Sequence, residues 1–148
     1  MSVAKHPSGT ETNKAILRRW IEEGWNKGNL AVADEVYTAN VVQHDSNSPM
    51  PVTSAEALKA YVGAYLTAFP DLNLTIDDLI AEGDKILWRF TSHGTHTGPL
   101  GPIQPTGKLG SITGMALFRF VNGKIAEVWV NIDLFGLMQQ LGVIPVMA

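Results

Sequence analysis

The spacing of the apolar residues changes about half-way along this chain, and that change constrains the fold more than any other feature. Before Asp71, apolar side chains recur every three or four residues, as they do on one face of a helix. Beyond Asp71 they alternate with polar ones, as in strands that have one buried face. Helices followed by strands predict an α+β fold, in which a curved antiparallel sheet covers N-terminal helices and encloses an apolar pocket.

Helix boundaries in the first half have recognisable signals. An amphipathic helix is expected over residues 12–27, with Gly28 at its end. Asn29 can cap a short second helix. Ser54 can cap a third helix, which Pro70 would stop.

The second half predicts strands joined by short turns. Asn122-Gly123 has the residue types of a type I′ hairpin turn, and Asp133 can cap a terminal helix that Gly142 would end. The expected strands cover residues 72–77, 85–97, 109–121 and 124–132.

Alternation also predicts which strand residues face the interior. Even positions hold most of the apolar side chains and are assigned to the core: Ile86, Trp88, Phe90, Ile112, Ala116, Phe118, Phe120, Ala126, Val128, Val130 and Ile132. Odd positions, such as Arg89, His93, Trp129 and Asn131, then form the outer face. A bulge in the last strand would reverse the assignment beyond it.

Length and composition limit the classes of protein. A chain of 148 residues has the size of one domain. Residues 1–11 are polar and are expected to form a disordered leader, with residues 12–148 as the single domain. A net charge of -3 without a run of basic residues argues against a nucleic-acid partner. The lack of cysteine fits a cytoplasmic protein, and no apolar stretch is long enough to span a membrane.

Seven segments extend over nearly all of the chain after the leader: residues 23–29, 68–71, 94–98, 105–107, 118–125, 127–129 and 133–142. In their order and spacing these segments resemble the SnoaL-like polyketide cyclase family. The resemblance implies the cone-shaped α+β barrel of nuclear transport factor two and ketosteroid isomerase, with a mixed or antiparallel sheet and usually a homodimer.

The resemblance also implies a chemistry and a departure from it. Characterised members of the family are acid–base enzymes that close rings on aromatic polyketides without a metal or organic cofactor. Polar residues that include their acid/base aspartate lie on the last two strands, at positions that correspond to Ala116 and Val130 in this chain, where both side chains are aliphatic. Two functions therefore remain open: acid–base chemistry on a hydrophobic carbonyl compound, or a small-molecule-binding or dimerisation module that has lost the acid/base.

Three residues are candidates for proton transfer, and each has a structural alternative. Asp133 follows the last strand and could act as a base at the pocket mouth, but the same position suits a helix cap. His44 and His96 lie at strand ends, where binding residues are common, but either could be a histidine hydrogen-bonded to the backbone. No histidine or carboxylate spacing indicates a metal site.

Large apolar side chains on helices and strands could line a pocket for a planar ligand, although aromatic residues more often fill a core. The predicted substrate-binding residues are Trp20, Tyr61, Tyr65, Trp88, Phe118 and Val130.

Overall fold

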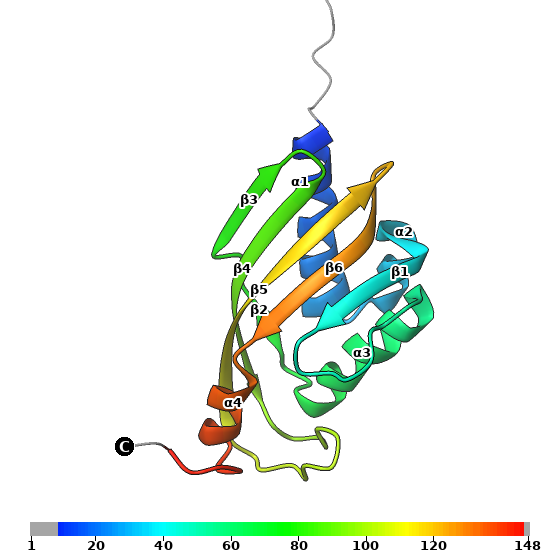
Figure 1. The fold of residues 1–148 in the computed structure, drawn as a ribbon. Coiled ribbons are helices and arrows are strands. Elements are labelled where there is room, and N and C mark those ends of the chain that lie inside the picture. The colour runs from blue at the N-terminus through cyan, green and yellow to red at the C-terminus, as the bar shows by residue number, and fades with distance from the viewer. Residues whose placement is uncertain (1–8, 147–148) are drawn as a thin grey trace, which may run out of the picture.

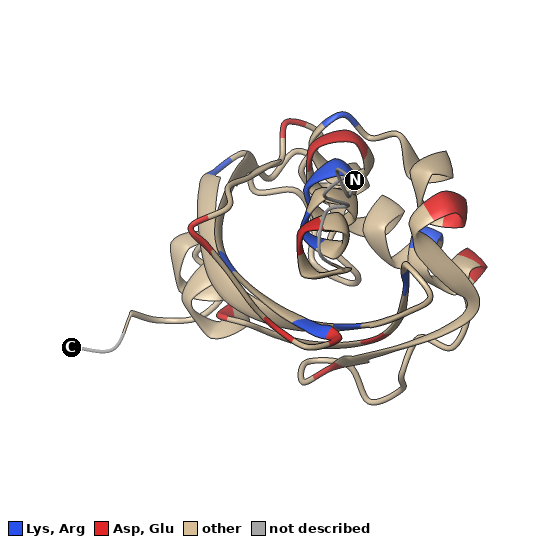
Figure 2. Ribbon diagram, turned by 90° about the horizontal axis from the view of Figure 1, so that it is seen from above, with Lys and Arg blue, Asp and Glu red and all other residues tan. Residues whose placement is uncertain are grey.

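The structure, a computed structural model, describes residues 9–146. It has two layers: a curved sheet, and helices that lie against the concave face of that sheet (Figures 1 and 2). The predicted α+β architecture is therefore confirmed. The first helix begins at Gly9, so residues 9–11 belong to it and not to a leader. The expectation for residues 1–8 lies outside the described residues.

The N-terminal helical segments follow one another closely, two before Gly28 and two after it. Helix α1 (Gly9–Arg19) passes directly into the π-helix η1 (Trp20–Asn26). Gly28 has a φ of 71°, the left-handed conformation expected at the end of a helix. The short elements η2 (Leu30–Val32) and α2 (Ala33–Val36) follow.

Local signals explain where the later helices begin. Helix α3 (Ala55–Ala68) begins after Ser54, whose hydroxyl accepts a hydrogen bond of 3.0 Å from the N–H of Ala57. Asn29 was expected to cap the second helix, but its side chain makes no capping hydrogen bond. The last helix is α4 (Leu134–Gln140).

Six strands form one mixed sheet in the order β1-β6-β5-β4-β2, with β3 also paired to β4 (Figure 1). Their bounds are β1 (Tyr37–Asp45), β2 (Asn73–Leu74), β3 (Asp78–Glu82), β4 (Lys85–Thr95), β5 (Leu109–Val121) and β6 (Lys124–Ile132). Strand β1 runs parallel to β6, whereas the other pairs are antiparallel. This parallel pair brings the end of β1 beside the end of β6.

The hairpin between β5 and β6 has the predicted turn and also a bulge. Asn122 and Gly123 have φ values of 49° and 76°, as a type I′ turn requires. Phe120 pairs with Ile125 but Arg119 pairs with Glu127, so Ala126 has no partner in the register. The assignment of Ala126 to the core is therefore wrong: Ile125 is buried in its place.

The strand expected over residues 72–77 is interrupted. Only Asn73 and Leu74 form β2. The side chain of Asn26 hydrogen-bonds both the N–H and the carbonyl of Leu74, at 2.7 and 3.0 Å. The amide thereby occupies the free edge of β2 and ties it to η1. The chain then stays extended along β4 until β3 begins at Asp78.

Candidate functional site

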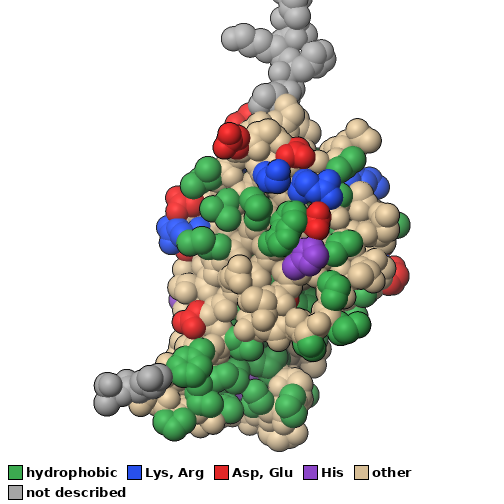
Figure 3. Space-filling view, in the orientation of Figure 1, with side chains coloured by type: hydrophobic (Ala, Val, Ile, Leu, Met, Phe, Trp, Pro, Cys, Tyr) green, Lys and Arg blue, Asp and Glu red, His purple; other side chains and the backbone are tan. Residues whose placement is uncertain are grey.

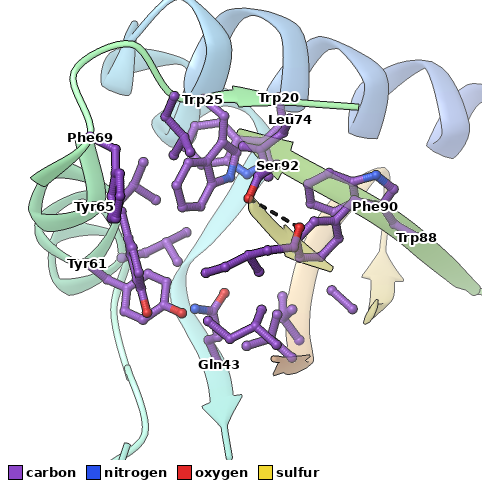
Figure 4. Close-up of a pocket in the computed structure, with 18 of the residues that line it drawn as sticks. Trp20, Trp25, Gln43, Tyr61, Tyr65, Phe69, Leu74, Trp88, Phe90 and Ser92 are labelled. Carbon is purple, nitrogen blue, oxygen red and sulfur yellow. Dashed lines mark hydrogen bonds between the residues drawn. The ribbon is translucent and has the colours of Figure 1, made fainter. Parts of the chain in front are cut away.

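An apolar cavity of about 80 Å³ lies between the concave face of the sheet and the helices. Side chains from η1, α3 and five strands surround it (Figure 4). Its lining comprises Trp20, Trp25, Tyr37, Gln43, Leu58, Tyr61, Val62, Tyr65, Phe69, Leu72, Leu74, Trp88, Phe90, Ser92, Gly94, Gly110, Ile112, Ala116, Phe118, Val128, Val130, Ile132 and Leu137. Such a lining suits a planar, largely apolar ligand.

The six residues predicted to bind a substrate all line this cavity. Trp20 comes from η1, Tyr61 and Tyr65 from α3, and the other three from the sheet. That they contact a substrate stays a prediction. Ala116 and Val130 pair directly across β5 and β6 and also line the cavity, so aliphatic side chains occupy the wall where the family resemblance implied a carboxylate.

Two glycines allow aromatic side chains of the cavity wall to pack closely. A β-carbon on Gly24 would overlap the ring of Trp20, so the absence of a side chain lets that indole lie against the π-helix. A β-carbon on Gly94 would stand 3.0 Å from the β-carbon of Phe69, so Phe69 packs directly on β4. These close approaches fix the positions of two aromatic rings in the wall.

Gln43 is a buried polar residue of the cavity wall. Only 6% of its surface is exposed, and its side-chain amide has no hydrogen-bond partner among the described residues. Figure 4 shows the amide pointing into the cavity, on the side where the hydroxyl groups of Tyr61 and Tyr65 lie. Within residues 9–146 the fully buried side-chain atoms without a partner belong to Thr38 and His96, so the Gln43 amide keeps some accessible surface. It is therefore available to a ligand oxygen or to solvent in the cavity.

Tyr61 connects the cavity to a carboxylate. Its hydroxyl donates a hydrogen bond of 2.8 Å to Oδ2 of Asp45. Asp45 lies at the end of β1, on the same face of the strand as Gln43. Burial raises the pKa of both Tyr61 and Tyr65, so that both hydroxyl groups stay protonated at neutral pH.

Two other polar groups of the wall contact the backbone. The indole N–H of Trp88 donates to the carbonyl of Thr75 at 3.3 Å, and the Ser92 hydroxyl makes a long contact of 3.5 Å with the carbonyl of Ile112 (Figure 4). The contact of Ser92 is at the limit of a hydrogen bond, so its hydroxyl is a second group that a ligand could engage.

Asp133 caps a helix. Its Oδ1 accepts a hydrogen bond of 2.9 Å from the N–H of Gly136 in the first turn of α4, and it does not line the cavity. Asp133 therefore makes the contacts of a helix cap, which was the structural alternative to a base. A role as general base stays a prediction that this position does not favour, because Asp133 does not line the cavity.

His44 lies on the outer face of the sheet, away from the cavity. Its Nε2 is 2.8 Å from Glu127 Oε2, and its ring stacks on Trp129 with 5.6 Å between centroids. Arg119 also pairs with Glu127, at 3.2 Å. The hydrogen bond from His44 is the main cause that lowers the pKa of Glu127. The structure thus places His44 in a cluster with Glu127, Arg119 and Trp129 on the outer face.

His96 is completely buried but does not line the cavity. Its Nδ1 lies 3.2 Å from the N–H of Thr106, which donates to it, while Nε2 has no partner among the described residues. The ring packs against Phe69, with centroids 5.3 Å apart, and Phe69 forms part of the cavity wall. The structure therefore does not bring His44, His96 and Asp133 together, and their catalytic roles stay predictions.

The sequence-based assignment missed Gln43 and Asp45. Both share the parity of the apolar Val41 in β1, so alternation along that strand could have placed them on the inner face. Attention to the strand end instead selected His44, the residue between them.

Within residues 9–146, no group of three or more histidine, cysteine or acidic side chains could hold a metal ion. In the same part of the chain, no helix has the length and apolar character needed to cross a membrane.

Comparison with known proteins identifies the family. A model of the SnoaL-like polyketide cyclase family matches residues 15–141, which is most of the chain. The chain belongs to the SnoaL-like polyketide cyclase family. No match was found among curated proteins.

Solved structures of this SnoaL-like type share the fold over most of the chain. AclR from Streptomyces galilaeus, a proposed hydroxylase, is 30% identical with a TM-score of 0.82, over 94% of this chain and 86% of AclR. A proposed SnoaL-like polyketide cyclase from Jannaschia sp. CCS1 is 21% identical with a TM-score of 0.86, and the match covers 97% of this chain and 100% of the cyclase. IdmH from Streptomyces antibioticus, a proposed polyketide cyclase, is 24% identical with a TM-score of 0.76, and the match covers 88% of this chain and 98% of IdmH.

Proposed function

We propose that this SnoaL-like protein binds a hydrophobic, carbonyl-bearing small molecule of the polyketide type in its cavity and carries out acid–base chemistry on it. The observation that carries the proposal is the Gln43 amide, which is buried among apolar and aromatic side chains and has no partner among the described residues. An amide N–H in that position can donate to a carbonyl oxygen. The same N–H would stabilise the negative charge on that oxygen when a neighbouring carbon loses a proton.

The shape and chemistry of the cavity support a flat, mostly carbocyclic ligand. Trp88 and Phe90 lie with their ring centroids 4.3 Å apart, and Tyr61 and Tyr65 meet edge to face at 5.3 Å on the opposite wall. Aromatic walls of this kind favour stacking against rings. The cavity wall has few polar groups that can hydrogen-bond a ligand, so the part of the ligand inside the cavity would carry few oxygens.

A binding comparison between two ligands of the same shape tests this proposal. α-Tetralone carries a ketone on a fused bicyclic ring, and tetralin is the same skeleton without the oxygen. Binding of both is measured by quenching of tryptophan fluorescence, because Trp20, Trp25 and Trp88 line the cavity. We expect α-tetralone to bind about tenfold more tightly than tetralin, the value of one hydrogen bond of ~1.4 kcal/mol. Equal affinity for the two ligands would contradict a carbonyl site.

A second function, ligand binding without chemistry, has one observation in its favour. None of the lining residues carries a carboxylate or an imidazole, and aliphatic Ala116 and Val130 occupy part of the wall. A carrier would bind α-tetralone without accelerating the exchange of its α-protons with solvent. Proton exchange therefore separates the two candidates.

We also propose that the protein forms a homodimer through the outer face of the sheet. Ile80 and Met115 on this face are 61% and 48% exposed. Trp129 pairs with Leu117, two residues along β5 from Met115. Apolar and charged side chains are mixed on this side of the molecule (Figure 3). Apolar side chains of this size, rimmed by charges, are typical of a surface that pairs with another protein.

A further inference from the structure

We propose that Tyr61 and Asp45 form a proton relay in the cavity wall. In this relay the Tyr61 hydroxyl oxygen takes a proton from the carbon next to the bound carbonyl while its own proton passes to Asp45. The inference rests on the function proposed above and supplies the base that the aliphatic wall of Ala116 and Val130 lacks.

The geometry of the pair carries the inference. Tyr61 lines the cavity, whereas Asp45 does not, and the two are joined by a hydrogen bond of 2.8 Å that Tyr61 donates. A ligand in the cavity therefore reaches the carboxylate through the phenol. The two residues come from different layers, Tyr61 from α3 and Asp45 from β1, so the contact is made only in the folded chain.

The carboxylate is held in place by a second contact. Oδ1 of Asp45 accepts a hydrogen bond of 2.8 Å from the N–H of Asn47, which leaves Oδ2 directed at Tyr61. A base whose position is fixed before the ligand arrives needs little reorganisation during the reaction. Gln43 lies two residues before Asp45 on the same face of β1, so the carbonyl donor and the base are fixed on one strand.

Burial of Tyr61 raises its pKa, so a free tyrosinate is not available as the base. Removal of a proton by Tyr61 therefore requires that its own proton leave at the same time. Asp45 is the group that accepts that proton, because the hydrogen bond already directs it there.

The relay balances without a further reactant. The C–H bond next to the carbonyl breaks, its electron pair moves to form an enolate, and Gln43 donates to the enolate oxygen. The proton forms a new O–H bond on Tyr61, and the former Tyr61 proton ends on Asp45. After the enolate carbon attacks a second carbonyl, Tyr61 protonates the new alkoxide and Asp45 returns its proton to Tyr61. The pair is then regenerated.

The contact could instead only anchor the end of β1 to α3. Exchange of the α-protons of α-tetralone in D₂O, followed by ¹H NMR, separates the two roles because it measures proton removal alone. Tyr61→Phe and Asp45→Asn are compared with the wild type, and the fluorescence assay measures binding for each. Asp71→Asn is the matched control: Asp71 likewise accepts from a backbone N–H and a hydroxyl, both of Thr95, but does not line the cavity.

We expect the wild type and Asp71→Asn to accelerate exchange equally, and both relay variants to lose at least a hundredfold in rate while affinity changes less than about threefold. Asp45→Asn keeps the Tyr61 hydroxyl, so it tests the relay even if Tyr61→Phe unfolds.

Unchanged exchange in Asp45→Asn would overturn the relay. A wild type that binds α-tetralone without accelerating exchange would also overturn it, and would leave the binding proposal standing. A wild type that does not bind α-tetralone would overturn both.

Discussion

Replacing Gln43 with leucine should make the protein more stable, although most core substitutions do the opposite. The side chain is 6% exposed and its amide has no partner among the described residues. A buried polar group without a partner costs about 1–3 kcal/mol. Water in the cavity can hydrogen-bond the amide and reduce this cost, so we expect Gln43→Leu to raise the free energy of unfolding by about 1–2 kcal/mol.

Thermal unfolding gives the assay and its scale. For a domain of this size, 1 kcal/mol moves Tm by about 2–4 °C, so Gln43→Leu should melt about 2–8 °C above the wild type. Gln140→Leu is the matched control, because the Gln140 amide makes hydrogen bonds of 2.7 and 2.8 Å with the backbone of Ser111. The same substitution should there lower Tm, since both hydrogen bonds are lost.

The stabilised variant should bind the ketone less well. Gln43→Leu should lose the preference for α-tetralone over tetralin, because the donor to the carbonyl is gone. A lower Tm for Gln43→Leu, or an undiminished preference for the ketone, would refute the view that Gln43 is kept unpaired for a ligand.

Three further predictions concern other parts of the molecule. Asp133→Ala should cost about 1 kcal/mol of stability through loss of the α4 cap while ketone binding is unchanged; weaker binding at constant stability would instead favour a role in the site. The pKa of Glu127 is lowered in the folded protein, so the pairing of its carboxylate stabilises the fold at pH values above the ordinary carboxyl pKa. This stabilisation is lost as the pH falls through the lowered pKa. The free energies of unfolding of the wild type and Glu127→Gln, measured by urea titration, should therefore differ at neutral pH and converge in acid. Met115→Glu should turn a dimer into a monomer in sedimentation experiments, and an unchanged mass would contradict the outer-face dimer.

Signals that act over a few residues predicted the fold well. The strand over residues 109–121 and that over residues 124–132 have the expected bounds, since alternation and the Asn122-Gly123 turn are both local. The cap at Ser54 follows from the chemistry of one hydroxyl. The bulge at Ala126 was harder to locate, because nothing in the residue types there marks the position of an extra residue.

Long-range relations account for what the sequence did not predict. The parallel pairing of β1 with β6 joins strands far apart in the chain, and no local pattern specifies it. Because the sequence does not specify that pairing, it did not distinguish His44 from Gln43 and Asp45 as a site residue at the end of β1. The inward direction of Gln43 and Asp45 follows from parity, but the contact of Asp45 with Tyr61 depends on where α3 lies over the sheet.

The carbonyl stretch of bound ¹³C-labelled α-tetralone, measured by isotope-edited infrared spectroscopy, reports directly on the hydrogen bond that Gln43 is proposed to donate. A hydrogen bond weakens the C=O bond, so the band should lie at lower frequency in the wild type than in Gln43→Leu. The same frequency in both proteins would contradict a carbonyl site at Gln43.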